Sequence, residues 1–413
     1  MRNCKSLFVE GLLCLGLVVQ AHASQKIVTF SPETTPQERI ESVNGMGGKV
    51  VRELRIINAV AAEFPATRSD RQILAAPDVE AVEEDRYIKW IESNPETLYD
   101  IPLPSVESVI AGAQSANTDI PDFVYSKTEP AADSEIPWGV ARVNAAAAWE
   151  KNQGEGVKVG VVDTGIDLTH PELAASIIGG YNSVNPSMQP MDDHGHGTHV
   201  SGTIAAIRDG KGVVGVAPMA SLYAVKVLDA QGSGTYSGVI AGIEWCVNNK
   251  VDVINMSLGG SQGSPAMAKV MKAAYDAGIT IVCAAGNSSG AVSYPAAYPE
   301  AIAVSASDSN DNITYFSCFG PQIAVIAPGL NIPSTWKGGG YKTISGTSMS
   351  SPHVAGLAAL AIGSGAKGPD AVRKALTHAA VKLPKLTEVQ QGAGMVDAGR
   401  LVNNQTVQIV MAR

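Results

Sequence analysis

Three short segments of the chain each place a reactive side chain among glycines and other small residues. Asp163 ends the run Val-Val-Asp, His196 opens the run His-Gly-Thr-His, and Ser348 lies within Gly-Thr-Ser-Met-Ser. A serine hydroxyl is a weak nucleophile, and a histidine can take its proton and return it to a leaving amine. A buried carboxylate holds such a histidine in the required tautomer. These residue types therefore predict a serine hydrolase with Ser348 as nucleophile, His196 as general base and Asp163 orienting the histidine.

Each of these segments has a simpler explanation when it is taken alone. Asp163 could only build a turn after a strand, and Ser348 could only cap a helix. A metallohydrolase is one alternative, because histidines and aspartates cluster at His194, His196, His199, Asp192 and Asp193. A non-catalytic binding module is another, although Gly154-Glu155-Gly156 precedes the first strand and no nucleotide-binding glycine motif follows it. The joint occurrence of all three segments favours the serine hydrolase.

The reactive residues follow segments that alternate between strand and helix patterns. Apolar, β-branched runs predict strands at 157–162, 222–227, 251–255 and 279–282, and helical periodicity lies between them at 238–249 and 265–276. This alternation predicts an α/β fold of the doubly wound type, with a mostly parallel sheet covered by helices on both faces. Ligand sites in such sheets gather at the carboxyl ends of the strands. Ser348 is expected at a helix start, where free N–H groups suit a developing oxyanion.

The chain divides into five predicted segments. Residues 24–91 follow a βαββαβ order, which indicates a small α+β, ferredoxin-like domain. Residues 92–133 are rich in proline and poor in apolar periodicity, so they are expected to form a linker. The α/β domain is expected to span 134–405, followed by a short tail at 406–413.

Residues 1–23 have the pattern of a secretory signal peptide. Arg2 and Lys5 form a basic start, the run 11–19 is apolar, and Ala21-His22-Ala23 supplies small residues before a cleavage site. The apolar run is too short to span a bilayer. The sequence therefore predicts a secreted protein, extracellular or periplasmic, that does not reside in a membrane.

The composition limits the partners. The 413 residues carry a formal net charge of −9, and only 5% are aromatic, which disfavours nucleic acid and anionic membrane as partners. We expect a monomer.

After signal removal three cysteines remain, Cys246, Cys283 and Cys318, and each lies in an apolar stretch. Three buried thiols are expected, with one disulfide plus a free thiol as the alternative.

At these motifs the sequence resembles the subtilisin-like serine protease family, from about residue 136 to residue 396. Residues 221–228 and 253–260 are especially specific to that family, and residues 24–91 resemble its inhibitory propeptide. The resemblance implies a serine endopeptidase that cleaves proteins through an acyl-enzyme, with the same triad. It makes His199 structural, and it makes Asn287 the oxyanion-hole partner of the Ser348 backbone N–H.

The resemblance also implies how substrate binds. An extended peptide would add a strand between two exposed segments. The residues implied on the two sides and in the S1 pocket are Gly232, Ser233, Gly234, Ser257, Leu258, Gly259, Ala285 and Gly286. A grip made mostly by backbone implies broad specificity, with a preference for large apolar P1 residues. The pocket segment 288–293 is shorter than in the common secreted subtilisins.

The family resemblance further implies one structural Ca²⁺ and an intramolecular inhibitor. The calcium ligands implied are Glu172, Ile207, Asp209, Lys211 and Val213, of which Ile207, Lys211 and Val213 would use their carbonyls, with Asp133 or Ser134 near a further position. A second calcium site is not expected, because Ala324 stands where a carboxylate is needed. Residues 24–91 are expected to assist folding and to inhibit the enzyme until a cut near 90–93.

Overall fold

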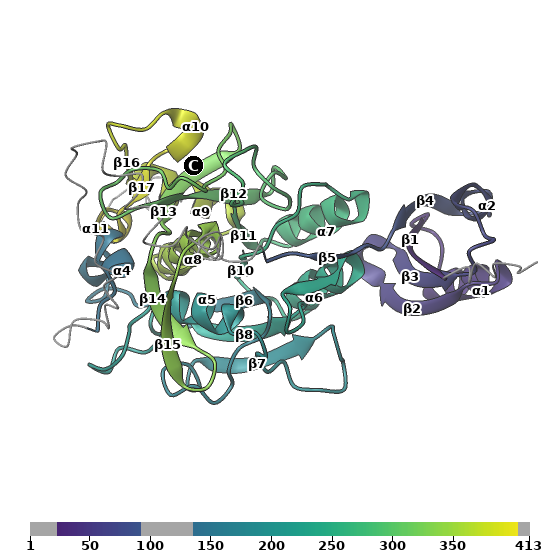
Figure 1. Cartoon of the computed structure of the whole chain (residues 1–413), viewed down its shortest axis with the longest axis horizontal. Coiled ribbons are helices and arrows are strands. Elements are labelled where there is room, and N and C mark those ends of the chain that lie inside the picture. Colours follow the sequence, from purple (N-terminus) through teal and green to yellow (C-terminus); the bar gives the residue numbers. More distant parts are fainter. Residues whose placement is uncertain (1–22, 92–134, 404–413) are drawn as a thin grey trace, which may run out of the picture.

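The computed structural model describes residues 23–91 and 135–403, which form a small N-terminal unit and a larger α/β domain (Figure 1). The predicted signal segment up to residue 22, the predicted linker and the predicted C-terminal tail lie outside the described residues. Figure 1 shows the small unit at one end of the molecule, with a single extended segment running from it into the larger domain.

The N-terminal unit has the βαββαβ order expected from the sequence. Its elements are β1 (Ser24–Phe30), α1 (Pro36–Gly45), β2 (Lys49–Leu54), β3 (Ala59–Phe64), α2 (Asp70–Leu74) and β4 (Val79–Glu84). The four strands form an antiparallel sheet in the order β2-β3-β1-β4. A short 3-10 turn, Arg55–Ile57, and a left-handed Asn58 separate β2 from β3.

The larger domain is built on a nine-stranded sheet, which confirms the predicted doubly wound fold. The strand order is β16-β17-β13-β12-β11-β10-β6-β8-β7, and every pair is parallel except β16 with β17. Its strands are β6 (Lys158–Asp163), β7 (Ile177–Asn182), β8 (Ser221–Lys226), β10 (Val253–Met256), β11 (Thr280–Ala284), β12 (Ala301–Ser307), β13 (Ile323–Pro328), β16 (Ala380–Val381) and β17 (Met395–Val396). Its helices are α4 (Trp138–Arg142), α5 (His196–Ala205), α6 (Tyr236–Asn248), α7 (Pro265–Asp276), α8 (Thr347–Gly363), α9 (Pro369–Ala379), α10 (Glu388–Gln391) and α11 (Ala398–Asn403), with a 3-10 turn at Ala145–Ala147.

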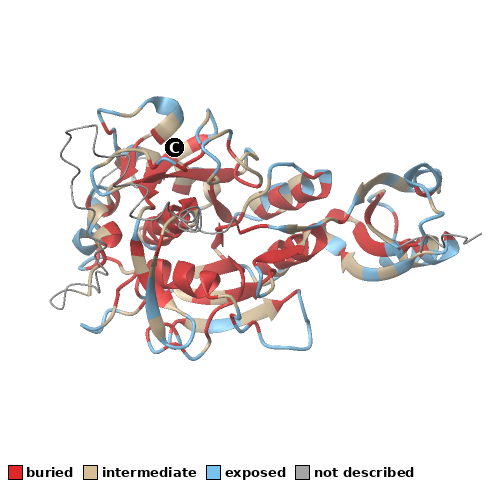
Figure 2. Cartoon of the chain, viewed as in Figure 1, coloured by how far each residue is buried: buried red, intermediate tan, exposed pale blue. Residues whose placement is uncertain are grey.

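Strand β6 illustrates how the sheet is covered on both faces. Val159 and Val161 pack in the same core cluster as α5 and α8, whereas Val162 packs in the cluster formed with α6 and α7. Gly160 faces α6, where a Cβ would lie 2.8 Å from the Cys246 sulfur. Because successive side chains of a strand point to opposite faces, a continuous apolar run is what a doubly covered strand requires. Figure 2 shows the resulting buried centre of sheet and helices with exposed loops around it.

Two smaller pairings complete the described fold. Strands β14 (Ile332–Trp336) and β15 (Gly340–Ile344) form an antiparallel hairpin before α8, which the sequence pattern did not indicate. Strand β5 (Tyr87–Lys89) leaves the N-terminal unit and pairs antiparallel with β9 (Ser233–Thr235) of the α/β domain.

Cys246, Cys283 and Cys318 are all buried and free. Within the described ranges, no helix has the length and apolar character needed to cross a bilayer.

Candidate active site

Asp163 and His196 meet where β6 ends and α5 begins. The His196 Nδ1–H donates to Asp163 Oδ1 over 2.8 Å, and both side chains are buried, with exposures of 5% for His196 and 0% for Asp163. The same carboxylate oxygen accepts the backbone N–H of Thr164. A Cβ on Gly197 would lie 2.1 Å from the Gly165 carbonyl oxygen, so only glycine permits this close approach. The bond at Nδ1 leaves Nε2 as the nitrogen available for proton transfer.

Ser348 is the second residue of α8, as the sequence predicted for a helix start. Its hydroxyl donates to the Ser257 carbonyl over 3.2 Å, just beyond the end of β10. The Ser257 hydroxyl in turn donates to the Ser348 carbonyl over 2.8 Å and is bonded to the Ser351 hydroxyl. Among the described residues, the hydrogen-bond partner of the Ser348 hydroxyl is thus Ser257 rather than His196. Ser348 is therefore held to the segment that follows β10.

Asn287 follows β11 and is held through its carbonyl oxygen. Its Oδ1 accepts the backbone N–H of Thr347 over 2.9 Å and the Thr347 hydroxyl over 3.0 Å. The Thr347 hydroxyl also accepts the backbone N–H of Gly286. Because Oδ1 is occupied, the side-chain NH₂ remains as the donor that Asn287 can offer to a ligand. Thr347 was not singled out from the sequence, and its role depends on a contact between distant segments.

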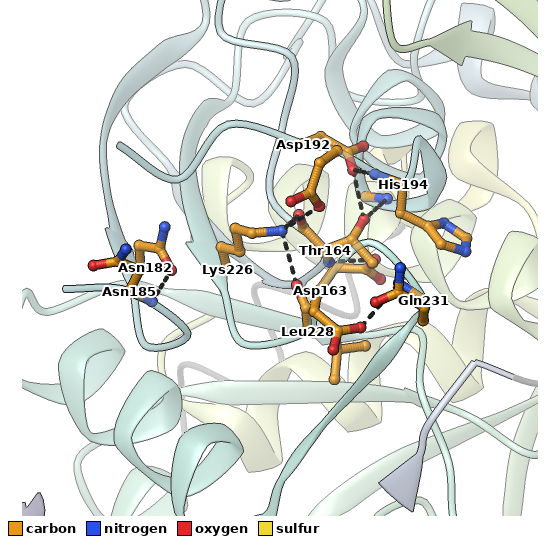
Figure 3. Close-up of polar contacts among 12 residues, drawn as sticks. Asp163, Thr164, Asn182, Asn185, Asp192, His194, Lys226, Leu228 and Gln231 are labelled. Carbon is orange, nitrogen blue, oxygen red and sulfur yellow. Dashed lines mark hydrogen bonds and ion pairs between the residues drawn. The ribbon is translucent and has the colours of Figure 1, made fainter. Parts of the chain in front are cut away.

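A buried lysine and a buried aspartate organise the loop that carries the histidines (Figure 3). The Lys226 ammonium donates to the carbonyls of Thr164 and Leu228 and to the Asp193 carboxylate, at 2.6 to 2.9 Å. Asp192 accepts the backbone N–H groups of residues 194, 195 and 198 and two threonine hydroxyls. These bonds join the ends of β6 and β8 to the start of α5. Lys226 is a site residue that sequence reasoning missed.

The other histidines of the sequence cluster have different surroundings. His199 is fully buried, its Nε2 lies 3.0 Å from the carbonyl oxygens of both Ile332 and Lys342, and burial lowers its pKa to about 3. It therefore anchors the β14–β15 hairpin as a neutral side chain. His194 is half-buried, and its ring lies 6.2 Å from that of His196. Within residues 23–91 and 135–403, no group of three or more His, Cys, Asp or Glu side chains is arranged to hold a metal.

The chain's own segment 87–91 lies between the two segments expected to flank a substrate. Beyond the pairing of β5 with β9, the Trp90 N–H donates to the Gly232 carbonyl over 3.0 Å. The Gly259 N–H donates to the Trp90 carbonyl over 3.0 Å, which completes the other side. A Cβ on Gly234 would lie 2.5 Å from the Val227 carbonyl oxygen, so glycine is required there as well. The segment is an added strand of the kind that peptide ligands form.

The Trp90 side chain is buried among residues of the larger domain. It is 2% exposed, its indole N–H donates to the Gly234 carbonyl over 3.0 Å, and its ring lies 4.7 Å from that of Tyr236. Gly260 borders the same space, because a Cβ there would lie 3.8 Å from the indole. An aromatic side chain with its polar N–H satisfied is well suited to such a pocket.

The residues expected around the S1 pocket come together next to Asn287. Leu258 and Ala285 are buried, and Gly286 has the left-handed φ of +108°. The Ser293 N–H donates to the Ala285 carbonyl, and the Ser293 side chain lies beside both Gly259 and Gly286. The short segment 288–293 therefore runs directly along this part of the cleft.

The loop predicted to bind calcium lies against Glu172. The Ile207 N–H donates to the Glu172 carbonyl, and the Tyr341 hydroxyl donates to Glu172 Oε1 over 2.6 Å. Glu172 Oε2 is buried and has no hydrogen-bond partner among the described residues. Burial raises the pKa of Glu172, and the negative charges of Asp209 and Glu135 raise it further. The orphaned oxygen and the neighbouring carboxylates fit a bound cation.

Glu135 occupies the N-terminal side of this loop. Its carboxylate accepts the Gly210 N–H over 2.7 Å, and its carbonyl accepts the Val214 N–H. Asp133 and Ser134, which the sequence placed near a ligand position, lie outside the described residues. Within the loop, Lys211 forms only a long ion pair with Asp209, at 3.9 Å.

A doubly wound α/β domain with a buried histidine–carboxylate pair and a serine at a helix start is an arrangement typical of serine hydrolases. Comparison with known proteins is more specific, since residues 154–396 match the model of the Subtilase family. The chain belongs to this family and is a serine endopeptidase.

The chain is similar to several curated proteases. M-protease of Shouchella clausii strain KSM-K16 is 40% identical over 339 residues, which cover 76% of this chain and 88% of the relative. Subtilisin E of Bacillus subtilis strain 168 is 40% identical over 325 residues, covering 77% of this chain and 74% of the relative. Subtilisin DY of Bacillus licheniformis is 47% identical over 231 residues, covering 54% of this chain and 84% of the relative.

Proposed function

We propose that the enzyme cleaves proteins through an acyl-enzyme on Ser348, with His196 as general base and Asp163 as its orienting partner. The observation that carries this proposal is the 2.8 Å bond between His196 Nδ1 and the buried Asp163 carboxylate. The carboxylate stabilises the imidazolium that forms when His196 takes the serine proton, and His196 then gives that proton to the leaving amine. Water then attacks the acyl-enzyme with His196 again acting as the base, and His196 returns the proton to Ser348 as the acyl group is released.

The oxyanion of the tetrahedral intermediate would be held by the Asn287 NH₂ and the Ser348 backbone N–H. Two features support these donors. Asn287 is fixed through its carbonyl oxygen by Thr347, and Ser348 lies in the first turn of α8, where N–H groups have no helical partner. Donors that are already oriented stabilise developing charge without a cost of reorganisation.

Substrate would bind as segment 87–91 does, paired with Gly232–Gly234 on one side and Ser257–Gly259 on the other. Most of these contacts use backbone atoms, which supports broad sequence specificity. Leu258, Ala285 and Gly286 supply an apolar wall beside Asn287, which supports a preference for large apolar P1 side chains.

We further propose that residues 24–91 are an inhibitory propeptide that also assists folding. Segment 87–91 fills the cleft that a substrate would need, which is the basis for inhibition. The remaining divisions follow the same scheme, with a signal peptide at 1–23, a linker at 92–133, a peptidase domain at 134–405 and a tail at 406–413. The mature enzyme would be a secreted monomer.

A structural Ca²⁺ would be held by Glu172, the Asp209 side chain and the carbonyls of the loop from Ile207 to Val213, including that of Lys211. The orphaned Glu172 oxygen supports this site. Calcium at about 100 times its Kd should raise the free energy of unfolding by about 2.7 kcal/mol. Glu172→Gln should lose this gain, while Glu150→Gln, at an exposed position, should keep it. Thermal unfolding with and without a chelator measures both, and equal gains in both variants would contradict the site.

The proposed mechanism is tested with Ser348→Ala. The variant should remain a full-length precursor and should lose casein hydrolysis on the order of a millionfold, the magnitude known from subtilisin itself. Gel analysis of self-processing and a casein assay measure the two outcomes. A Ser348→Ala protein that matured and cleaved casein like the wild type would rule the mechanism out.

A further inference from the structure

His194 is the histidine of the original cluster that has no part in the proposed triad or in anchoring a hairpin. Its backbone N–H is held by Asp192, but in Figure 3 its ring points away from Asp192, toward the side where Gln231 lies. It comes immediately before Gly195 and the catalytic His196, so the loop that fixes His196 also fixes the place of His194.

The His194 ring lies beside Gly232, the glycine whose carbonyl accepts the backbone N–H groups of Trp90 and Ile91. A Cβ placed on Gly232 would lie 3.6 Å from His194 Nε2 and 3.0 Å from the Ile91 Cβ. The imidazole and the Ile91 side chain therefore border the same glycine of the edge that pairs with a bound peptide. The ring also lies 6.2 Å from that of His196, which places it close to the reacting atoms.

The imidazole has unused hydrogen-bonding capacity. His194 Nδ1 is buried and has no partner among the described residues, while Nε2 is the nitrogen that faces Gly232, the glycine that the Ile91 side chain also borders. A neutral imidazole donates from one nitrogen and accepts at the other, and it donates from both when protonated. A substrate side chain in the place of Ile91 can therefore receive a hydrogen bond that the apolar Ile91 does not use.

The charges that face His194 set when it is protonated. Burial lowers the pKa of His194, and the charged forms of His196 and Lys337 lower it further, whereas Asp163 and Asp192 act in the opposite direction. The ring is consequently neutral at neutral pH and gains its proton only in acid. A carboxylate brought next to it would favour the protonated form.

We propose that His194 is a specificity-determining residue that selects substrates with a carboxylate side chain at the position taken by Ile91. The neutral ring donates one hydrogen bond to this carboxylate, and the protonated ring adds an ion pair, so the preference strengthens as the pH falls. The inference rests on the proposed function, because it takes segment 87–91 as a guide to how substrate lies.

The test uses the processed enzyme and peptides that carry residues 85–95 with Glu, Gln or Ile at position 91. The quantity compared is the ratio of kcat/KM for the Glu and Gln peptides, from which the titration of His196 cancels. In the wild type this ratio should be about fivefold to tenfold near pH 5.5 and should approach one near pH 8.5. His194→Asn should hold the ratio near one throughout, whereas His378→Asn, at an exposed position on α9, should match the wild type.

The outcomes separate this inference from the proposed function. A wild-type enzyme that cleaves the Ile peptide but treats Glu and Gln alike would overturn the role of His194 and leave the protease mechanism standing. A Glu preference that persists unchanged in His194→Asn would also overturn it. A wild-type enzyme that cleaves neither casein nor any of the three peptides would overturn both the role of His194 and the proposed function.

Discussion

The active-site residues and the acidic residues at the end of β4 find their hydrogen-bond partners in different parts of the molecule. In the peptidase cleft the partners are internal, as with Asp163 and His196 or Asn287 and Thr347. In the N-terminal unit, acidic groups near the end of β4 bond across the boundary. Asp85 accepts the backbone N–H and the hydroxyl of Ser237, at 2.8 and 2.6 Å. The two active-site pairs thus lie within one domain, whereas Asp85 takes its hydrogen-bond partners from the other domain.

The contact between the two regions is centred on the N-termini of two helices. Asp85 binds the first turn of α6, and Glu83 accepts the Ala266 N–H in the first turn of α7 over 2.8 Å. Carboxylates are favoured at helix N-termini because the N–H groups there are free and the helix dipole is positive. In the opposite direction, Glu244 of α6 accepts the Arg55 N–H. Figure 1 shows β5 passing between these helices into the larger domain. We therefore expect variants at the active site to change catalysis, and variants at the boundary to change the inhibition proposed for residues 24–91.

The largest expected effect is on catalysis within the cleft. Asn287→Ala should lower kcat by about 100- to 1,000-fold with little change in KM, a magnitude taken from the oxyanion-hole asparagine of subtilisin itself. The exposed Asn248 provides the control, and Asn248→Ala should leave both constants unchanged. Steady-state kinetics on a chromogenic peptide measure this. A large rise in KM at constant kcat would show that Asn287 binds the ground state instead.

A boundary change should affect inhibition without affecting the free enzyme. Asp85→Ala leaves the Ser237 N–H and hydroxyl without their partner, so the isolated 24–91 peptide should inhibit the processed protease about tenfold less tightly. Glu63 is exposed on β3, and Glu63→Ala should inhibit like the wild type. Inhibition constants measured by competition with a peptide substrate decide the point. Equal constants for all three peptides would remove Asp85 from the contact.

A smaller catalytic effect is expected from the group that positions Asn287. Thr347→Val removes the hydroxyl that donates to Asn287 and accepts from Gly286, which should lower kcat by about fivefold to tenfold. Thr347→Ser keeps the hydroxyl and should restore most of the rate. A KM effect in place of a kcat effect, or no rescue by serine, would show that Thr347 acts only through packing.

The smallest expected effect is on how inhibition by residues 24–91 depends on pH. Burial raises the pKa of Glu83, Asp85 and Glu244 in the complex, although Arg86, Arg52 and Arg55, respectively, act against this shift. Between the ordinary and the raised pKa values, the complex binds more protons than the separated parts. Lowering the pH through that interval should therefore tighten inhibition, by about twofold to fivefold, and raising it should weaken inhibition. Glu244→Gln should flatten this dependence, and an inhibition constant that falls as the pH rises would contradict the assignment.

Sequence patterns were sufficient to predict the residues and elements that depend on local structure. Asp163, His196 and Ser348 were predicted because each follows or opens a regular element and lies among glycines. The doubly wound sheet and the βαββαβ order of the N-terminal unit followed from periodicity in the same way. Asn287 came from family resemblance, since a Gly-Asn pair after a strand is by itself an ordinary turn.

What could not be predicted depends on contacts between segments far apart in the chain. Thr347 at the start of α8 positions Asn287 in the loop after β11, and Lys226 links loops after two different strands. The packing of the Trp90 ring against the Tyr236 ring joins segment 87–91 to α6. In each of these cases the partner is chosen by the folded structure rather than by its neighbours in sequence. The start of α6 at Tyr236, earlier than the predicted Gly238, has a local cause instead, because the Thr235 side chain accepts the Gly238 N–H and caps the helix.

The most direct test of the central claim is to identify the residue that a serine-directed fluorophosphonate modifies. The processed wild-type enzyme should carry one adduct, and peptide mass mapping should place it on Ser348. The His196→Ala variant and a precursor whose cleft is filled by segment 87–91 should react far more slowly. An adduct on another residue, or equal labelling of a Ser348→Ala protein, would contradict the account.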